Sequence, residues 1–343
     1  MFEGSYTAIV TPFKREGDVD FEGLRQLVDF QVKGGISGII VAGTTGESPT
    51  LTWEEHEKVI EEVYEHAPSK CRVVAGTGSN STKECMEGTR FAAKKGVDSV
   101  LLVDPYYNGP SSLEIRREYI EPIARKFPDM NIIPYVIPGR TGTQLLPQDL
   151  AILSSTFTNV NSVKEATGDI TNMRLTRKLC GKDFSILSGD DDKTLTIVQD
   201  SEIRASGVVS VTSNIAPRAV TNLVREGMHY SNAKQIHESL GSLFSCITVK
   251  TSEQSRFGDV QVKARNPLAT KTLMNIMGMP SGSCRQPLGK LTKNAIGLVL
   301  EQARKTHEEH PEILRPVEEF FDVDLSERLY SPRYLDGLSY ESY

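Results

Sequence analysis

Lys164 is the residue of this chain whose type and position say most about chemistry. It follows Ser162 and Val163 at the end of a short apolar segment, where a lysine side chain is expected to be buried. Burial disfavours the ammonium form and lowers the pKa of the amine. A neutral amine can attack a ketone and form a Schiff base. The alternative is a lysine at a strand end that extends its ammonium group to water.

Other polar residues follow apolar segments in the same way. Thr44 and Thr45 stand in a turn with a glycine on either side, where hydroxyl and backbone N–H groups can form a small anion site or simply cap a helix. Tyr135 ends another apolar segment, but a phenol with a pKa near 10 is a poor base unless a hydrogen-bond relay assists it. Arg140 follows in a Pro-Gly turn, and its guanidinium either pairs with a carboxylate through two hydrogen bonds or is solvated.

Eight short apolar runs position these residues, and amphipathic stretches fill most of the gaps between them. Apolar strands that alternate with helices indicate a parallel sheet buried on both faces. Eight such units predict an α/β TIM (β/α)8 barrel, in which chemistry takes place at the carboxyl ends of the strands. The runs span residues 6–10, 38–41, 72–75, 99–103, 132–136, 160–163, 184–187 and 207–211.

The strand pattern stops after Pro217. We therefore expect a catalytic barrel over residues 1–226, a C-terminal helical extension over 227–310 and an acidic, tyrosine-bearing tail over 311–343. A polar segment near 248–265 interrupts the extension and lacks a clear period. Helical patterns cover residues 217–226, 231–247, 268–277 and 291–306.

Composition excludes several classes of protein. The 343 residues carry a net charge of −6 without a basic block, so a nucleic-acid partner is not expected. No apolar run approaches the roughly 18 residues of a membrane span, and no signal segment is visible. The five cysteines form no C-x-x-C pair, which favours reduced thiols and a cytoplasmic location.

Two local motifs raise other possibilities. Asp190, Asp191 and Asp192 are adjacent carboxylates, which we expect to cap the following helix and be hydrated rather than bind a metal. The Gly76–Ser81 segment resembles a phosphate loop only loosely, because it lacks a third glycine and the lysine-hydroxyl pair. We therefore expect no metal and no nucleotide.

The polar segments together resemble the dihydrodipicolinate synthase branch of the pyruvate-dependent class I aldolases, a family that also contains N-acetylneuraminate lyase. The resemblance runs from Tyr6 to about Ala219, in the same order and at similar spacing. Val136 and Gly139 depart from the asparagine and serine common in the family. The segments are Gly43-Thr44-Thr45-Gly46-Glu47-Ser48, Pro105-Tyr106-Tyr107-Asn108, Tyr135-Val136-Ile137-Pro138-Gly139-Arg140-Thr141-Gly142, Val163-Lys164-Glu165-Ala166-Thr167-Gly168, Ser188-Gly189-Asp190-Asp191 and Gly207-Val208-Val209-Ser210-Val211-Thr212.

The resemblance implies a lyase of the diaminopimelate and lysine biosynthetic pathway. It would condense pyruvate with L-aspartate 4-semialdehyde through a Schiff base on Lys164, without a separate cofactor. Tyr135, Thr45 and Tyr107 would form the proton relay, with Tyr107 supplied by a neighbouring subunit of a homotetramer built from two dimers. The implied substrate-binding residues are Thr44, Thr45, Arg140, Gly189 and Val209, the last two through their backbone carbonyls.

The resemblance also implies an allosteric site for L-lysine, the end product of the pathway. Glu84 and Trp53 have structural alternatives: a capping box from Ser81 to Glu84 like the one from Thr52 to Glu55, and simple cover of a helix start. The matching positions are Ser48, Pro49, Trp53, His56, Asn80, Glu84 and Tyr106.

Two other functions remain compatible with the residues. A sister aldolase acting on a 2-keto-3-deoxy sugar acid or on N-acetylneuraminate would share Lys164 and Tyr135, and Arg140 is the feature that favours the synthase. A regulatory protein that binds pyruvate without turnover would not need the complete set of Lys164, Tyr135, Thr45 and Tyr107.

Overall fold

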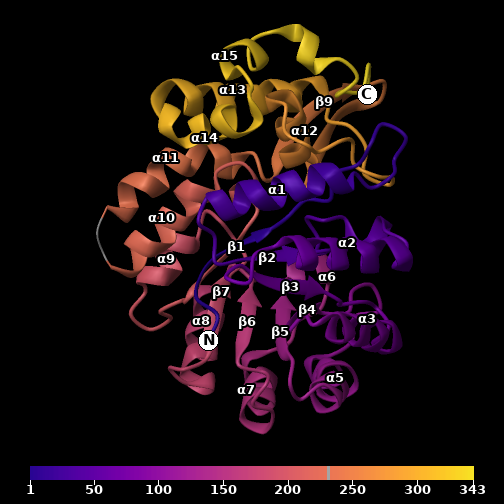
Figure 1. The fold of residues 1–343 in the computed structure, drawn as a ribbon, viewed down its shortest axis with the longest axis vertical. Helices are drawn as coiled ribbons and strands as arrows, with labels where there is room; N and C mark the ends of the chain where they lie inside the picture. The colour runs from indigo at the N-terminus through magenta and orange to yellow at the C-terminus, as the bar shows by residue number, and fades with distance from the viewer. Residues whose placement is uncertain (230–231) are drawn as a thin grey trace.

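The computed structural model describes residues 1–229 and 232–343, and its centre is a closed barrel of eight parallel strands in chain order (Figure 1). The predicted TIM barrel with a C-terminal helical extension is therefore confirmed. The strands are β1 (Gly4–Ala8), β2 (Gly38–Val41), β3 (Arg72–Gly76), β4 (Ser99–Val103), β5 (Asn131–Val136), β6 (Ser162–Glu165), β7 (Ser185–Ser188) and β8 (Gly207–Ser210).

Helices connect successive strands on the outside of the barrel. Between Ser112 and Lys126 the connection includes one stretch of wider, π-type hydrogen bonding, Ile115–Ile120. The helices are α1 (Phe21–Lys33), α2 (Trp53–His66), α3 (Thr82–Lys95), α4 (Ser112–Glu114), α5 (Glu121–Lys126), α6 (Pro138–Thr141), α7 (Pro147–Thr156), α8 (Ile170–Cys180), α9 (Thr194–Gln199) and α10 (Pro217–Met228).

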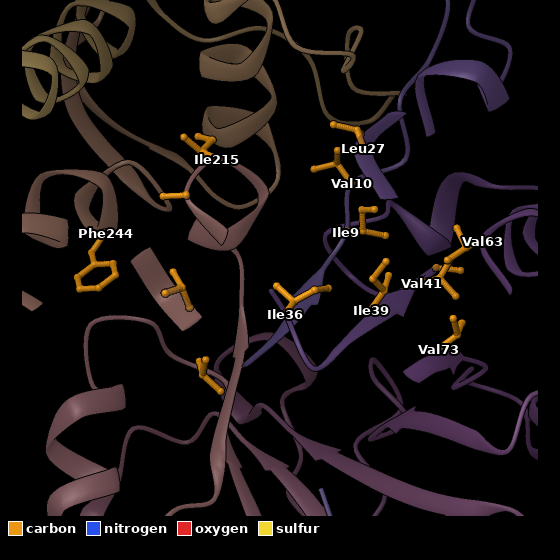
Figure 2. Close-up of a cluster of buried hydrophobic side chains, with 14 of the residues drawn as sticks. Ile9, Val10, Leu27, Ile36, Ile39, Val41, Val63, Val73, Ile215 and Phe244 are labelled. Carbon is orange, nitrogen blue, oxygen red and sulfur yellow. The ribbon is translucent and has the colours of Figure 1, made fainter. Parts of the chain in front are cut away.

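Alternation along the strands divides the core into two shells. In β2, Ile39 and Val41 belong to the outer cluster that packs against the helices, whereas Ile40 points into the barrel. Figure 2 shows Ile39 and Val41 among outer-cluster side chains that include Leu27 of α1 and Val63 of α2. The inner cluster fills the barrel and is made of Phe2, Tyr6, Ala8, Ile40, Val74, Leu101, Ile133, Tyr135, Ala166, Leu187 and Val209.

Lys164 lies inside a strand and not just beyond one. The apolar run predicted at 160–163 forms β6 over Ser162–Glu165, because Lys164 and Glu165 continue the ladder opposite Tyr135 and Val136 of β5. The other strands lie within one or two residues of their predicted bounds. The lysine side chain is consequently fixed on the barrel wall.

The two predicted capping boxes have different outcomes. Thr52 and Glu55 form a complete box at the start of α2. At α3, Ser81 accepts from the backbone N–H of Glu84, but the Glu84 carboxylate accepts from the Ser79 hydroxyl instead of the Ser81 N–H. The Ser79 oxygen already accepts from that N–H, so the prediction of a box was wrong there.

The extension beyond the barrel is mainly helical, as predicted. It contains α11 (Ala233–Ser245), α12 (Leu268–Met277) and α13 (Lys293–Glu309), followed by α14 (Pro311–Phe321) and α15 (Leu325–Arg328) in the tail. The start predicted for the helix at 231–247 falls on a residue outside the described ranges. Figure 1 shows these segments, orange to yellow, gathered at one end of the molecule.

The polar segment near 248–265 is a β-hairpin of β9 (Val249–Ser255) and β10 (Gly258–Ala264). Its two-residue period was hidden in the sequence because two of its inward positions, Thr251 and Glu253, are polar. Glu253 accepts a hydrogen bond from Asn294 of α13, which explains a carboxylate on the covered face.

A buried ion pair joins the extension to the barrel. Lys271 Nζ of α12 lies 2.6 Å from Glu47 Oε1, and both side chains are about 1% exposed. Glu47 ends the turn that carries Thr44 and Thr45, so this turn is held from the C-terminal side. Over the described ranges, no helix combines the length and apolar character needed to span a bilayer.

Candidate active site

Lys164 is buried at the carboxyl end of the barrel, 5% exposed. Its Nζ lies 3.9 Å from the centroid of the Tyr135 ring on the neighbouring strand. Burial lowers the pKa of Lys164 to about 7; the charges of Asp190 and Asp191 oppose this shift, and that of Arg140 adds to it. The amine is therefore substantially neutral near pH 7, as a nucleophile must be.

Gly189 packs directly against the lysine stem. A Cβ placed on Gly189 would lie 2.6 Å from Ala166 Cβ and 3.3 Å from Lys164 Cε. Its backbone N–H donates to Glu165 O at 2.7 Å, which fixes the end of β7 beside β6. The absence of a side chain at position 189 thus makes room for the lysine.

A cavity of about 200 Å³ opens at this end of the barrel. It brings Thr44, Tyr135 and Arg140 together in its wall. The full lining is Ala42, Gly43, Thr44, Ser48, Pro49, Gly76, Gly78, Leu101, Val103, Tyr106, Tyr135, Ile137, Arg140 and Thr141.

Tyr135 keeps its proton in this environment. Burial raises the pKa of its phenol to about 12, while the Arg140 charge and a hydrogen bond with the Thr44 side chain act in the opposite direction. The phenol is thus a proton donor beside the amine. Val209 of β8 is fully buried in the inner cluster.

Asn266 is a site residue that the sequence analysis missed. Its Nδ2 donates to Thr45 Oγ1 at 3.0 Å, and its backbone carbonyl accepts from Arg140 Nη2 at 3.0 Å. It therefore contacts two of the predicted residues from outside the barrel. The only sequence signal is its place directly after the polar segment, before Pro267.

Tyr107 does not join the cavity of its own chain. Its side chain is 93% exposed, and its backbone has a φ of +81°, which is uncommon for a residue other than glycine. The turn after β4 therefore directs this aromatic ring away from Lys164 and into solvent.

The expectation that Asp191 is hydrated and caps the following helix was wrong. Asp191 is buried and accepts from the Ser210 hydroxyl and from the backbone N–H groups of Val211 and Thr212, which ties β7 to the end of β8. Burial raises its pKa to about 6, against these hydrogen bonds. In the ranges described, no three His, Cys, Asp or Glu side chains are grouped as metal ligands would be.

The residues matched to a lysine site lie on adjacent βα units. Trp53 packs edge-on to His56 with ring centroids 5.1 Å apart, and burial lowers the pKa of His56 to about 4. Asn80 is exposed, whereas Glu84 is partly buried. Burial raises the pKa of Tyr106, and the charge of Glu84 adds to that shift. Ser48, Pro49 and Tyr106 line the same cavity as Tyr135.

Comparisons with known proteins show which family this chain resembles. The model of the Dihydrodipicolinate synthetase family matches residues 1–303. A 4-hydroxy-tetrahydrodipicolinate synthase of Methanococcus maripaludis strain C6 is 40% identical over 294 residues, which span 85% of this chain and 94% of that protein.

Two solved structures are also similar along most of the chain. The 4-hydroxy-tetrahydrodipicolinate synthase of Methylacidiphilum fumariolicum SolV superposes with a TM-score of 0.81 at 35% identity, covering 94% of this chain and 100% of that one. The dihydrodipicolinate synthase of Cyanidioschyzon merolae with lysine bound gives 0.80 at 34% identity, covering 89% and 98%.

Crowding at position 189 can be tested by substitution. Gly189→Ala should lower turnover on the order of a hundredfold, because small displacements of reacting groups have effects of that size. Gly241→Ala on α11 is the control, since a Cβ there meets nothing within 4 Å. Steady-state kinetics and the pH dependence of Lys164 modification would be measured. Full activity of Gly189→Ala would contradict a steric role for this glycine.

Proposed function

The chain belongs to the dihydrodipicolinate synthetase family, and we propose that Lys164 carries its chemistry by forming a Schiff base with pyruvate. The enzyme is a 4-hydroxy-tetrahydrodipicolinate synthase, a lyase that condenses pyruvate with L-aspartate 4-semialdehyde. The observation that supports the role of Lys164 is its burial beside the Tyr135 phenol, which lowers the pKa of the amine to about 7.

Schiff-base formation uses the two groups that face each other. The neutral amine adds to the ketone carbon of pyruvate, and Tyr135 donates a proton to the departing hydroxyl, which leaves as water. Thr44 and Thr45 hold the pyruvate carboxylate through hydroxyl and backbone N–H groups. The iminium is itself the electron sink, so no separate cofactor takes part.

Carbon–carbon bond formation follows from the iminium. Loss of a methyl proton gives an enamine, whose carbon attacks the aldehyde of the second substrate. Arg140 receives that substrate's carboxylate, and Asn266 fixes the guanidinium through its carbonyl. The substrate's own amino group then displaces Lys164 from the imine carbon, which closes the ring and frees the enzyme. The backbone carbonyls of Gly189 and Val209 complete the pyruvyl site.

Trapping the adduct tests the role of Lys164. Borohydride with pyruvate should add the pyruvyl mass to the peptide containing Lys164, and the rate should rise with pH through about 7 as the amine loses its proton. Lys193, whose Nζ donates to Gly168 O at 3.1 Å, is an internal control that should stay unlabelled. A label elsewhere, or none, would exclude this role.

We further propose that Tyr107 completes the proton relay of a neighbouring subunit. An aromatic ring held outward by a left-handed backbone suits a contact across an interface better than one within its chain. Thr45, engaged by Asn266, would connect it to Tyr135. The assembly would be a homotetramer of two dimers.

Removing the phenolic hydroxyl tests this relay. Tyr107→Phe should lower turnover by roughly a hundredfold or more, the usual contribution of a proton-transfer group, without altering the oligomer. Tyr343→Phe, an exposed tyrosine at the chain end, should leave turnover unchanged. Sedimentation velocity on active enzyme is the second measurement, and an active monomer would exclude the assignment.

L-lysine is the proposed inhibitor, and its site would comprise Trp53, His56, Asn80, Glu84 and the adjoining cavity residues. The Glu84 carboxylate suits an ammonium group, because the Ser79 hydroxyl donates a hydrogen bond to it and it does not bind the Ser81 N–H in a capping box. Coupling to catalysis would run through Tyr106, which adjoins Tyr107. A relative's structure with lysine bound supports a ligand of this kind.

Glu84→Thr should therefore remove lysine inhibition. Ser81 still caps α3 in this variant, so the free energy of unfolding should fall by only about 1–2 kcal/mol. Glu87→Thr, an exposed change on the same helix, should retain inhibition. Inhibition curves against pyruvate would be compared for the three proteins. Wild-type activity that does not respond to lysine would leave these residues with packing roles only.

A further inference from the structure

The β9–β10 hairpin has one strongly cationic face. Lys250 and Lys263 lie directly opposite each other in the antiparallel register, and both are exposed. Arg265 follows two residues after Lys263 and is exposed as well. We refer to Lys250, Lys263 and Arg265 as the cationic face.

This arrangement is unfavourable for the hairpin itself. Like charges directly opposite on neighbouring strands destabilise the pairing. Over the described chain, none of the three side chains forms an ion pair within 4.0 Å. The charge of Arg265 lowers the pKa of Lys263, and partial desolvation and the charges of Lys250 and Arg140 act in the same direction.

The cationic face adjoins the mouth of the catalytic cavity. Arg265 Nη1 donates to Gly139 O at 3.1 Å, next to Arg140 in the cavity wall. The following residue, Asn266, accepts from Arg140 and donates to Thr45. Two successive residues at the end of the hairpin are thus bonded to the site.

We propose that the cationic face collects pyruvate at the cavity mouth. This role rests on the proposed function, in which pyruvate is the first substrate. Pyruvate has a charge of −1, and the protein that it approaches has a net charge of −6. Asp190 also lies near the Lys164 amine that pyruvate must reach. A local patch of positive charge raises the concentration of an anion at such a mouth and speeds its entry.

The second substrate provides an internal comparison. L-aspartate 4-semialdehyde carries one carboxylate and one ammonium group, so its net charge is zero near pH 7. A patch that acts at long range through charge should therefore favour pyruvate over the semialdehyde. Salt should weaken the effect, because the Debye length falls from about 30 Å at 0.01 M to about 3 Å at 1 M.

The experiment uses full-length Lys250→Gln/Lys263→Gln, which leaves the Arg265 hydrogen bond to Gly139 intact. At low salt, kcat/KM for pyruvate should fall roughly three- to tenfold, at the lower end of electrostatic steering effects. The value for the semialdehyde should change less than about twofold, and the loss for pyruvate should disappear in roughly 1 M salt.

Arg256→Gln is the control variant on the same hairpin. It removes one positive charge from the same hairpin at the connection between the strands, beside the exposed Phe257, with no hydrogen bond to the site. Its kcat/KM for pyruvate should stay near that of the wild type. An equal loss in this variant, an equal loss for both substrates, or a loss that persists in high salt would overturn the steering role.

Borohydride trapping at limiting pyruvate separates the two levels of inference. An adduct on Lys164 that forms at the same low-salt rate in wild type and the double variant overturns steering and leaves the proposed function standing. Absence of the adduct in the wild type overturns the proposed function and the steering role together. A slower low-salt rate in the double variant, with a wild-type rate in Arg256→Gln and no difference between the proteins in roughly 1 M salt, supports capture of pyruvate by this face.

Discussion

The exclusion of water from one lysine amine is the constraint on which the site depends. An ammonium group on β6 is desolvated by the barrel wall, by the Tyr135 ring and by the backbone at Gly189, and its pKa falls to about 7. The same burial raises the pKa of Tyr135 to about 12. One environment thus produces a neutral nucleophile and a protonated acid side by side, which is the pairing that addition to a ketone and loss of water require.

The C-terminal region supports this environment through buried polar contacts. Lys271 donates to Thr11 O and pairs with Glu47, whose other oxygen accepts from the backbone N–H of Arg285. Removing one partner of a buried pair of this kind typically costs about 3–5 kcal/mol, because the remaining charge is left without compensation. The turn that carries Thr44 and Thr45 is therefore part of a unit that spans the barrel and the extension.

The features that follow from local sequence could be predicted, and those that depend on distant partners could not. Apolar runs and amphipathic gaps located all eight strands, and the polar residues after them located Thr44, Tyr135 and Arg140. Asn266 was missed because it reaches Thr45 across 221 positions of the chain. For the same reason, nothing near Asp191 in the sequence indicated that its carboxylate would bind the end of β8.

The hairpin can change in sequence independently of the barrel. β9 and β10 hydrogen-bond to each other as a separate two-stranded sheet, outside the ladder of the barrel. Residues on its outward face can therefore mutate without disturbing the strands that hold Lys164. Barrel positions such as Gly189 have no such freedom, because any side chain there meets the lysine stem. Under the proposed steering, substitutions on this hairpin change how strongly salt affects the entry of pyruvate and leave the geometry around Lys164 unchanged.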